Sequence, residues 1–252
     1  MDRDTPGTSV AESFTRKAAA AQKWPVLTLD TAVGDLIRLA GLTLDVGCGP
    51  GSVTCRMAGR AGEVAGLDVT PAMLALARQA GQEQRIENVS WYLGDACSIP
   101  FKDSAFSIVT SRYVFHHIED QKIAFEEMAR VCETGGTILL ADVAPDPGTR
   151  RAFDRVERLK DSSHRRSLTP GEFTGLAREY GLSGIRTSAF RLEMDLNGQG
   201  QAAGWDRETA DRIRQIYNDD IGKNVLGVSA CRYGNAIRFS YPSLILAGMK
   251  NA

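Results

Sequence analysis

The chain of 252 residues lacks a long hydrophobic run: no apolar stretch approaches the roughly 18 residues that a membrane-spanning helix needs. Its first ten residues, MDRDTPGTSV, hold no apolar signal region. The net charge is only −1, so there is no overall basic field to attract nucleic acid or an anionic membrane. We therefore expect no membrane span and no nucleic-acid partner.

Cysteine and histidine are also scarce. The five cysteines form no Cys-x-x-Cys pair, and this odd number in a chain of such length indicates reduced thiols in a cytoplasmic protein. The three histidines are His116, His117 and His164. No metal site is predicted, because the adjacent side chains of His116 and His117 are expected to diverge. A Gly-x-Ser-x-Gly motif is absent, so esterase chemistry has no support.

With 43% hydrophobic and 24% charged residues, the composition is that of a globular protein, and the length fits one α/β domain over 1–252. Short apolar runs alternate with helical patterns after residue 42. The predicted strands are 43–46, 63–68, 89–95, 106–111 and 136–142, and the predicted helices are about 52–60, 71–80 and 119–132. This alternation predicts a doubly wound, mostly parallel sheet with helices on both faces.

The remaining segments follow a different pattern. Helices are predicted at 11–40 (interrupted at Pro25), 149–161, 169–180 and 207–219, strands at 183–194 and 237–250, and a loop or lid edge at Gly198–Gly204. The two late strands predict an antiparallel hairpin that closes the sheet, with 237–250 beside the fifth strand.

The most informative stretch is LDVGCGPG, residues 44–51, between the first strand and a helix. Gly47, Gly49 and Gly51 allow a tight turn and the close approach of a ligand. The helix N-terminus is expected to offer free N–H groups, and Asp45 could hold a cationic group, so the loop suits an amino acid zwitterion. A dinucleotide loop has a third glycine where Ser52 stands, which disfavours the alternative of a nicotinamide-dependent dehydrogenase.

Two further acids end the next strands. Asp68 can accept hydrogen bonds from both hydroxyls of a ribose, and Asp95 can accept one from an adenine amine. Together with Asp45, these acids stand at the carboxyl ends of neighbouring strands, which is where open α/β sheets bind ligands. The pattern therefore predicts one nucleoside-binding crevice.

Five motifs in order, LDVGCGPG, GLDVTPAML, GDACSIPF, SRYVFHHIED and EEMARVCETGGTILLAD, resemble those of class I S-adenosylmethionine-dependent methyltransferases. Within these, the chain is most similar to the ubiquinone/menaquinone-biosynthesis C-methyltransferases and related small-molecule enzymes. The resemblance is strong over 42–145, and 162–182 adds a weaker match. It implies a Rossmann-like fold of seven strands in the order 3-2-1-4-5-7-6, with an antiparallel last strand, and the cofactor S-adenosyl-L-methionine.

The resemblance also implies different roles for successive regions of the chain. Residues 1–40 would form a helical lid with Phe14 and Trp24 near the substrate, 42–145 the cofactor-binding core, 146–235 the substrate-side helices and 236–252 the final strand. The implied cofactor-binding residues are Asp45, Gly47, Cys48, Gly49, Gly51, Asp68, Val69, Met73, Asp95, Ala96, Ser111 and Arg112.

The candidate catalytic residues follow the fourth strand. His116 or His117 could take a proton from a phenol or a carbon acid, and packing roles are the alternative for each. His164 either faces the substrate from the opposite wall or lies in a surface loop. Arg112 and Tyr113 would position the substrate. Only one of the adjacent histidines is expected to matter, because neighbouring side chains usually point in different directions.

The predicted function is methyl transfer to oxygen or carbon of a small, cyclic or aromatic molecule by a monomer or homodimer. No Asn-Pro-Pro-Tyr motif follows the fourth strand, which disfavours methylation of nucleobase amines, and no pair of aspartates there could hold the magnesium ion of a catechol enzyme. One alternative stays open: a methyltransferase-like fold that retains the cofactor but catalyses another rearrangement, or only binds or regulates.

Overall fold

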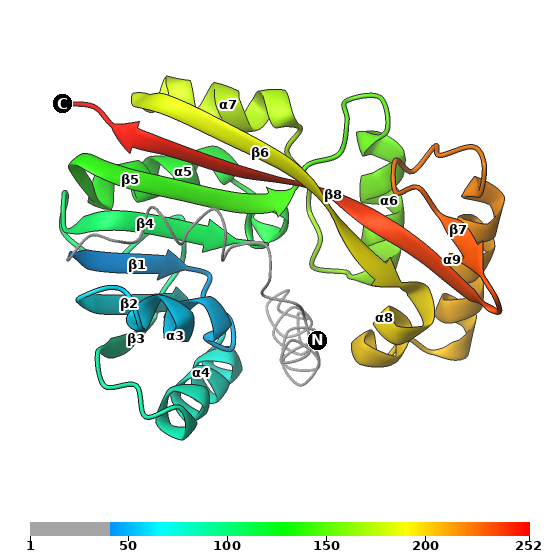
Figure 1. Ribbon diagram of the computed structural model, residues 1–252, viewed down its shortest axis with the longest axis horizontal. Coiled ribbons are helices and arrows are strands. Elements are labelled where there is room, and N and C mark those ends of the chain that lie inside the picture. Colours follow the sequence, from blue (N-terminus) through cyan, green and yellow to red (C-terminus); the bar gives the residue numbers. More distant parts are fainter. Residues whose placement is uncertain (1–40) are drawn as a thin grey trace, which may run out of the picture.

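The computed structural model describes residues 41–252, so the predicted helical lid, with Phe14 and Trp24, lies outside the described residues (Figure 1). In chain order, the described elements are β1 (Leu42–Val46), α3 (Ser52–Ala58), β2 (Glu63–Asp68), α4 (Pro71–Glu83), β3 (Val89–Leu93), β4 (Phe106–Arg112), the 3₁₀ helix η1 (Phe115–His117), α5 (Gln121–Val131), β5 (Cys132–Val143), α6 (Arg150–Lys160), α7 (Pro170–Glu179), β6 (Leu182–Asp195), α8 (Leu196–Ala203), α9 (Arg207–Asp220), β7 (Cys231–Tyr233) and β8 (Ala236–Lys250).

The described strands form one sheet in the order β3-β2-β1-β4-β5-β8-β6. The pairs among β1 to β5 are parallel, whereas β8 runs antiparallel to both β5 and β6. The predicted order is therefore confirmed, with the final strand inserted beside the fifth. The short strand β7, which pairs only with the start of β8, was missed, because three exposed residues give no hydrophobic pattern.

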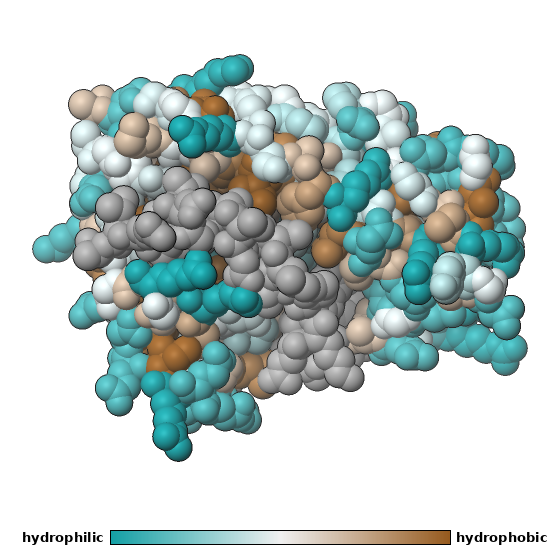
Figure 2. Space-filling view, viewed as in Figure 1, coloured by the Kyte–Doolittle hydropathy of each residue, from teal (hydrophilic) through white to brown (hydrophobic). Residues whose placement is uncertain are grey.

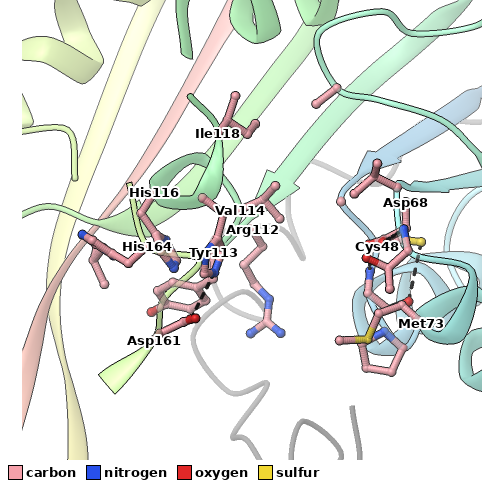
Figure 3. Close-up of a pocket in the computed structure, with 18 of the residues that line it drawn as sticks. Cys48, Asp68, Met73, Arg112, Tyr113, Val114, His116, Ile118, Asp161 and His164 are labelled. Atoms are coloured by element: carbon pink, nitrogen blue, oxygen red, sulfur yellow. Dashed lines mark hydrogen bonds and ion pairs between the residues drawn. The ribbon is translucent and has the colours of Figure 1, made fainter. Parts of the chain in front are cut away.

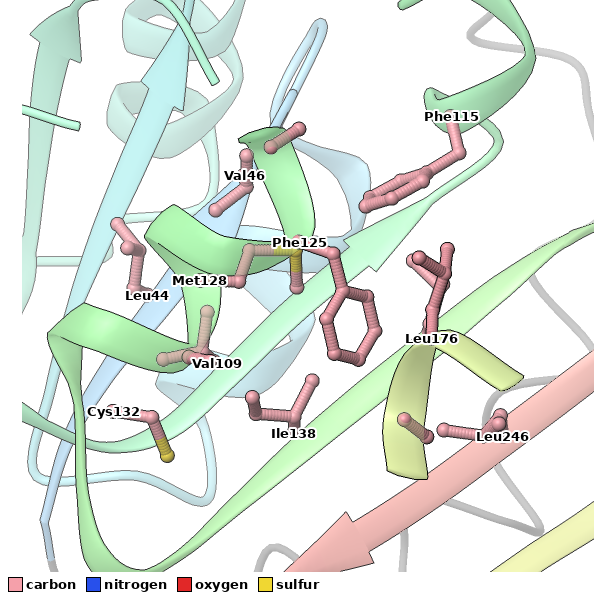
Figure 4. Close-up of a cluster of buried hydrophobic side chains, with 14 of the residues drawn as sticks. Leu44, Val46, Val109, Phe115, Phe125, Met128, Cys132, Ile138, Leu176 and Leu246 are labelled. Atoms are coloured by element: carbon pink, nitrogen blue, oxygen red, sulfur yellow. The ribbon is translucent and has the colours of Figure 1, made fainter. Parts of the chain in front are cut away.

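Alternate residues of the central strands face two separate cores. In β5, Ile138 and Leu140 pack with α5 and α7 on one face of the sheet, and Figure 4 shows part of this cluster around Phe125 and Met128. Leu139 and Ala141 point the other way and pack with α3. Because side chains alternate along a strand, a parallel strand covered by helices on both faces needs apolar residues at consecutive positions, and ILLA provides them.

The strands β6 and β8 are longer than β5 and continue beyond it as an antiparallel ribbon. The first half of β8 pairs with the second half of β6, from Arg238 opposite Asp195 to Ser243 opposite Phe190. The helices α6, α8 and α9 gather on this ribbon (Figure 1). They enclose a further core that includes Phe153, Tyr217 and Phe239. One sheet thus carries two structural regions, and the ribbon connects them.

The prediction of a loop at Gly198–Gly204 is wrong, because Leu196–Ala203 forms α8. The side chain of Asp195 caps this helix by accepting a hydrogen bond from the Gly198 N–H at 2.7 Å. Gly200 packs so closely on the Trp205 ring that a Cβ would lie 2.7 Å from it, and Gly204 ends the helix with a φ of 66°. Capping and packing here outweigh the low helix propensity of glycine.

Hydrophilic residues cover most of the coloured surface in Figure 2, around smaller apolar areas. Within residues 41–252, no helix is both long enough and apolar enough to cross a membrane. The five cysteines, all in this part of the chain, are free thiols.

Truncation of Phe125 should strongly destabilise the fold. Its side chain is fully buried on α5, and its ring lies 6.4 Å from that of Phe115 and 5.7 Å from that of Tyr180, measured between ring centres. We expect Phe125→Ala to lower the free energy of unfolding by about 3–5 kcal/mol in urea titrations. Ile123→Ala, on the exposed side of the same helix, is the control and should change it by about 0.5 kcal/mol. Equal losses in both variants would contradict this core.

Candidate active site

A cavity of about 590 Å³ lies at the carboxyl ends of the parallel strands and continues toward the ribbon region. We call its two parts the glycine-loop half and the histidine half. The glycine-loop half is lined by Asp45, Gly47, Cys48, Gly49, Asp68, Val69, Met73, Asp95 and Ala96. The histidine half is lined by Arg112, Tyr113, His116, His117, Val143, Glu157, Lys160, His164, Leu192, Gln199, Trp205 and Tyr241. The cavity therefore brings together most of the residues selected from the sequence.

The loop between β1 and α3 needs glycine for two different reasons. Gly47 and Gly49 have φ angles of 71° and 54°, in the left-handed region that other residues avoid. A Cβ on Gly47 would also overlap the Val114 side chain. Within residues 41–252, a Cβ on Gly49 would meet no atom within 4 Å, because this residue borders the cavity. Gly47 thus serves close packing, whereas Gly49 leaves room for a ligand.

The N–H groups at the start of this loop are bonded within the protein, so they are not among the free donors expected at the helix N-terminus. The N–H groups of Gly47 and Cys48 both donate to the Leu67 carbonyl of β2, at 2.8 and 2.9 Å. The Gly49 N–H donates to Oδ2 of Asp68 at 2.8 Å. These bonds fasten the loop to the end of β2. These three amides are therefore engaged within the protein, whereas Gly49 borders the cavity without a Cβ.

The acids that end β1 and β2 are held in different ways. Asp45 is 1% exposed and accepts a hydrogen bond from Oγ1 of Thr54 at 2.6 Å. Burial raises the pKa of Asp45 to about 6, although the Thr54 bond and the positive charge of Arg112 oppose this shift. Asp68 also accepts from the Thr70 N–H at 2.8 Å, and burial raises its pKa. A cationic ligand group beside Asp45 would favour its ionised form.

Two residues predicted to bind the cofactor do not line the cavity. Gly51 faces the opposite way: a Cβ there would lie 2.6 Å from the Trp91 ring and 3.0 Å from Cβ of Ala77. Ser111 is fully buried within β4, and its hydroxyl has no hydrogen-bond partner in the described part of the chain. Gly51 therefore serves packing between α3, α4 and β3, and Ser111 belongs to the sheet interior.

The three histidines form one cluster, which corrects the expectation that His116 and His117 diverge. Both lie in the single turn of η1, with ring centres 4.0 Å apart, and the His164 ring lies 5.4 Å from that of His116. His164 is 2% exposed, so it does not lie in a surface loop. Its ring packs beside that of His116, so it does not face His116 from an opposing wall. Even so, no group of three or more histidine, cysteine, aspartate or glutamate side chains in residues 41–252 is arranged to hold a metal ion.

Hydrogen bonding distinguishes His116 from its neighbours. Its Nδ1 lies 2.5 Å from Oδ1 of Asp142, a carboxylate that is 1% exposed at the carboxyl end of β5. The same carboxylate accepts from the backbone N–H groups of Val143 at 2.7 Å and His116 at 3.2 Å. Because the carboxylate accepts a bond from Nδ1–H, Nε2 is the ring nitrogen with a free lone pair. His116 and Asp142 therefore have the geometry of a base and the residue that orients it.

The other two histidines have different partners. Nδ1 of His117 lies 3.0 Å from the Ser163 hydroxyl, and its Nε2 lies 4.0 Å from Oδ2 of Asp161. Nε2 of His164 lies 2.9 Å from Oδ1 of Asp154. Burial tends to raise the pKa of Asp154, but hydrogen bonds from His164 and Ser167 outweigh it, and the pKa is lowered. His117 thus has polar contacts at both ring nitrogens. His164 pairs with its acid through Nε2, much as His116 does through Nδ1, but its side chain is only 2% exposed against 15% for His116, so His116 is the more accessible of the two.

Several residues of the histidine half were not predicted from the sequence. Asp142 ends β5 as Asp45 ends β1, so the same signal could have identified it. Lys160 could not have been found, because nothing in a charged helix marks its burial. Its ammonium group contacts Glu157 at 2.8 Å, the Tyr241 hydroxyl at 3.1 Å and the Tyr217 hydroxyl, and burial lowers its pKa. Lys160, Glu157 and Tyr241 of this network line the histidine half.

Comparison with known proteins identifies the family. Residues 44–140 match the family described as "Methyltransferase domain". The chain is 29% identical over 258 residues to the uncharacterised methyltransferase YcgJ of Bacillus subtilis (strain 168), covering 99% of this chain and 100% of that protein. It is 32% identical over 168 residues to the 2-phytyl-1,4-naphtoquinone methyltransferase of Thermosynechococcus vestitus, covering 65% and 72%. The chain belongs to the S-adenosylmethionine-dependent methyltransferases.

Solved structures agree in fold. The YcgJ crystal structure has a TM-score of 0.81 at 25% identity, covering 88% of this chain and 99% of that one. Phosphoethanolamine N-methyltransferase 2 of Haemonchus contortus, in complex with S-adenosyl-L-methionine, has a TM-score of 0.67 at 17% identity, covering 98% and 59%. The expected fold is confirmed. The family establishes S-adenosylmethionine as the cofactor and sets the nicotinamide alternative aside.

Two glycine substitutions should show which glycine packs against the protein and which borders space for a ligand. Gly47→Ala combines a left-handed φ with overlap of Val114, so we expect it to lower the free energy of unfolding by several kcal/mol, about 1–2 from the backbone and 1–3 from overpacking. Gly49→Ala has only the backbone cost of about 1–2 kcal/mol, because its Cβ enters the cavity. Urea titration of both variants measures the difference. A loss for Gly49→Ala that matches or exceeds the Gly47→Ala loss would contradict the loop geometry.

Proposed function

We propose that the protein transfers a methyl group from S-adenosylmethionine to an oxygen or carbon atom of a small cyclic or aromatic molecule bound in the histidine half. One observation carries this proposal: a single cavity joins the glycine loop to a histidine whose Nε2 is free and whose Nδ1 is held by a buried carboxylate. The cofactor supplies an electrophilic methyl group on a sulfonium. The chain's own residues have to orient the two molecules, exclude water and accept a proton.

The glycine-loop half fits the cofactor. The open space beside Gly49 supports close contact between the backbone and a ligand. The buried carboxylate of Asp45 suits the ammonium of the methionine moiety, because opposite charges attract strongly where water is excluded. Asp68, fixed by two backbone N–H groups, keeps lone pairs for the ribose hydroxyls. Asp95 and Ala96, which also line this half, would lie at the adenine, with Cys48, Val69 and Met73 around them.

The histidine half fits a flat, largely apolar acceptor. Tyr113, Trp205 and Tyr241 contribute aromatic surface to its wall, and Val143 and Leu192 contribute aliphatic surface. Aromatic rings stack favourably on such side chains. The charges of Glu157 and Lys160 neutralise each other within this wall. These features support a ring-bearing acceptor better than a long flexible chain.

We assign the proton-accepting role to His116 and the positioning role to Asp142. A hydroxyl or an acidic C–H of the acceptor would donate its proton to Nε2 of His116, and the imidazolium would be stabilised by the Asp142 carboxylate at 2.5 Å. His117 stays the alternative base, and His164 supports the cluster by packing on His116. Cytoplasmic location, a role in small-molecule biosynthesis and a monomeric or homodimeric state stay predictions.

Loss of Asp68 should weaken cofactor binding. Asp68→Ala removes a charged acceptor, so we expect the affinity for S-adenosylhomocysteine to fall about 30- to 150-fold in calorimetry, equivalent to about 2–3 kcal/mol. Asp68→Asn retains one carbonyl acceptor and should show a smaller loss. Glu133→Ala, which removes an exposed carboxylate remote from the cavity, is the control. Unchanged affinity in folded Asp68→Ala protein would rule out the ribose assignment.

Loss of the base should reduce turnover without loss of the cofactor. Labelled-methyl transfer from S-adenosylmethionine into a cell extract would first identify the acceptor. With that acceptor, we expect His116→Ala to lower kcat by about 10²–10⁴-fold, while the affinity for S-adenosylhomocysteine is unchanged. Asp142→Asn should shift the pH profile of kcat, because the neutral amide no longer stabilises the imidazolium, and Asp142→Glu should restore part of the profile.

The matching variants His117→Ala and His164→Ala serve as comparisons. A large loss of kcat in His117→Ala alone would move the base to His117. Near-normal turnover in both the His116 and the His117 variants would exclude either histidine as the base. Cofactor binding without transfer to any component of the extract would favour a rearrangement or a binding role.

A further inference from the structure

Arg112, at the end of β4, has a guanidinium that no group in residues 41–252 engages in a hydrogen bond or ion pair. Residues 41–252 supply no hydrogen-bond acceptor or carboxylate within ion-pair distance of its guanidinium, and its Nε is fully buried without an acceptor. Burial lowers the pKa of Arg112, although the negative charge of Asp45 opposes the shift. A buried charge without a partner destabilises a fold unless a ligand compensates it.

Other charged side chains at the cavity do have partners. Lys160 is paired with Glu157 at 2.8 Å, and Asp142 with the imidazole of His116. Asp68 accepts two backbone N–H groups. Arg112 therefore differs from the charges that hold the fold together. Its hydrogen-bonding capacity is left for a molecule that enters the cavity.

The guanidinium is also held in position. Its Cζ lies 5.5 Å from the ring centre of Tyr113, and the Tyr113 hydroxyl is hydrogen-bonded to that of Ser243 at 3.1 Å. Figure 3 shows the Arg112 side chain reaching into the space between Tyr113 and His116 on one side and Asp68 and Met73 on the other. Arg112 lines the cavity together with Tyr113 and His116.

We propose that Arg112 binds an anionic oxygen of the acceptor, so that the substrates of this enzyme are acids that carry a carboxylate or an ionised phenol or enol oxygen. This inference rests on the proposed function. The guanidinium presents parallel N–H groups that match the two oxygens of a carboxylate, and its charge favours the ionised form of a phenol or enol. Together with the aromatic wall, the chemistry selects a ring-bearing acid over a neutral molecule or an amine.

The cofactor also carries a carboxylate, so the anion could come from either molecule. Two features favour the acceptor: the guanidinium packs on Tyr113, which lines the histidine half, and Arg112 lies in the same segment as the base His116. The experiment must separate the two sources, and it can do so without turnover.

The acceptor arm measures binding of aromatic carboxylates, beginning with benzoate, and of the corresponding amides, beginning with benzamide, to protein saturated with S-adenosylhomocysteine. We expect the wild type to prefer the carboxylates. Arg112→Gln should lose about 10- to 100-fold in carboxylate affinity and leave amide binding unchanged. Arg155→Gln, which removes an exposed arginine of α6, should match the wild type. A wild type that does not prefer the carboxylates, or an Arg112→Gln variant that retains the preference, would overturn the proposal.

The cofactor arm compares S-adenosylhomocysteine with its analogue that lacks the carboxylate. Equal affinities of wild type and Arg112→Gln for both compounds support the acceptor assignment. A loss confined to S-adenosylhomocysteine would assign the anion to the cofactor and overturn it. Failure of the wild type to bind S-adenosylhomocysteine would instead refute the proposed function, and carboxylate binding to the unloaded protein would still test Arg112.

A stability measurement distinguishes ligand binding from a structural role. Arg112→Met keeps a side chain of similar length and removes a buried guanidinium that has no hydrogen-bond or ion-pair partner in residues 41–252, so the Tm of the ligand-free variant should equal or exceed that of the wild type. Under the proposal, the same variant loses carboxylate binding. A clear drop in Tm would mean that Arg112 supports the fold, and this would overturn the assignment.

Discussion

The cavity depends on the hydrogen bonds that fasten the glycine loop to the end of β2. Two N–H groups of the loop converge on the Leu67 carbonyl, and a third donates to Asp68, which is itself held by the Thr70 N–H. These bonds hold the left-handed glycines through groups of the protein itself. Such bonds reduce the free energy that ligand binding has to spend on ordering the loop.

A second constraint shapes the histidine half: each imidazole is matched to an acid or a hydroxyl. Asp142, Asp154 and the pair Ser163 and Asp161 contact different rings of the cluster. Buried acids must be compensated, and the imidazoles accomplish this where helices α6 and α7 meet the sheet. The cluster thus joins segments that lie far apart in the sequence, and its three histidines line the cavity.

Sequence patterns predicted the strand order and the glycine-loop half of the cavity because both depend on local signals in the sequence. Asp45 and Asp68 follow strands whose apolar runs are unambiguous, and Gly47 and Gly49 stand in a short motif. The helix α8 and the contact between His116 and His117 were mispredicted, because an aspartate cap, a tryptophan and a single 3₁₀ turn determine them. Lys160 and its tyrosines lie about 60 to 80 positions apart in the chain, so no local pattern connects them.

Part of the histidine half, including Val143, Leu192 and Tyr241, packs in the core of the ribbon, whereas Val46 and Leu67 near the glycine loop belong to another core. The matched family region, 44–140, covers the glycine loop and η1, whereas α6, α8 and the first half of β8 complete the histidine half. Packing changes within the ribbon core leave the core beneath the glycine loop intact, since the two share few side chains. With such an architecture, substitutions in the ribbon region can alter the pocket for the methyl acceptor while the cofactor-binding loop stays the same. Laboratory evolution of a new acceptor preference should therefore begin in the ribbon region.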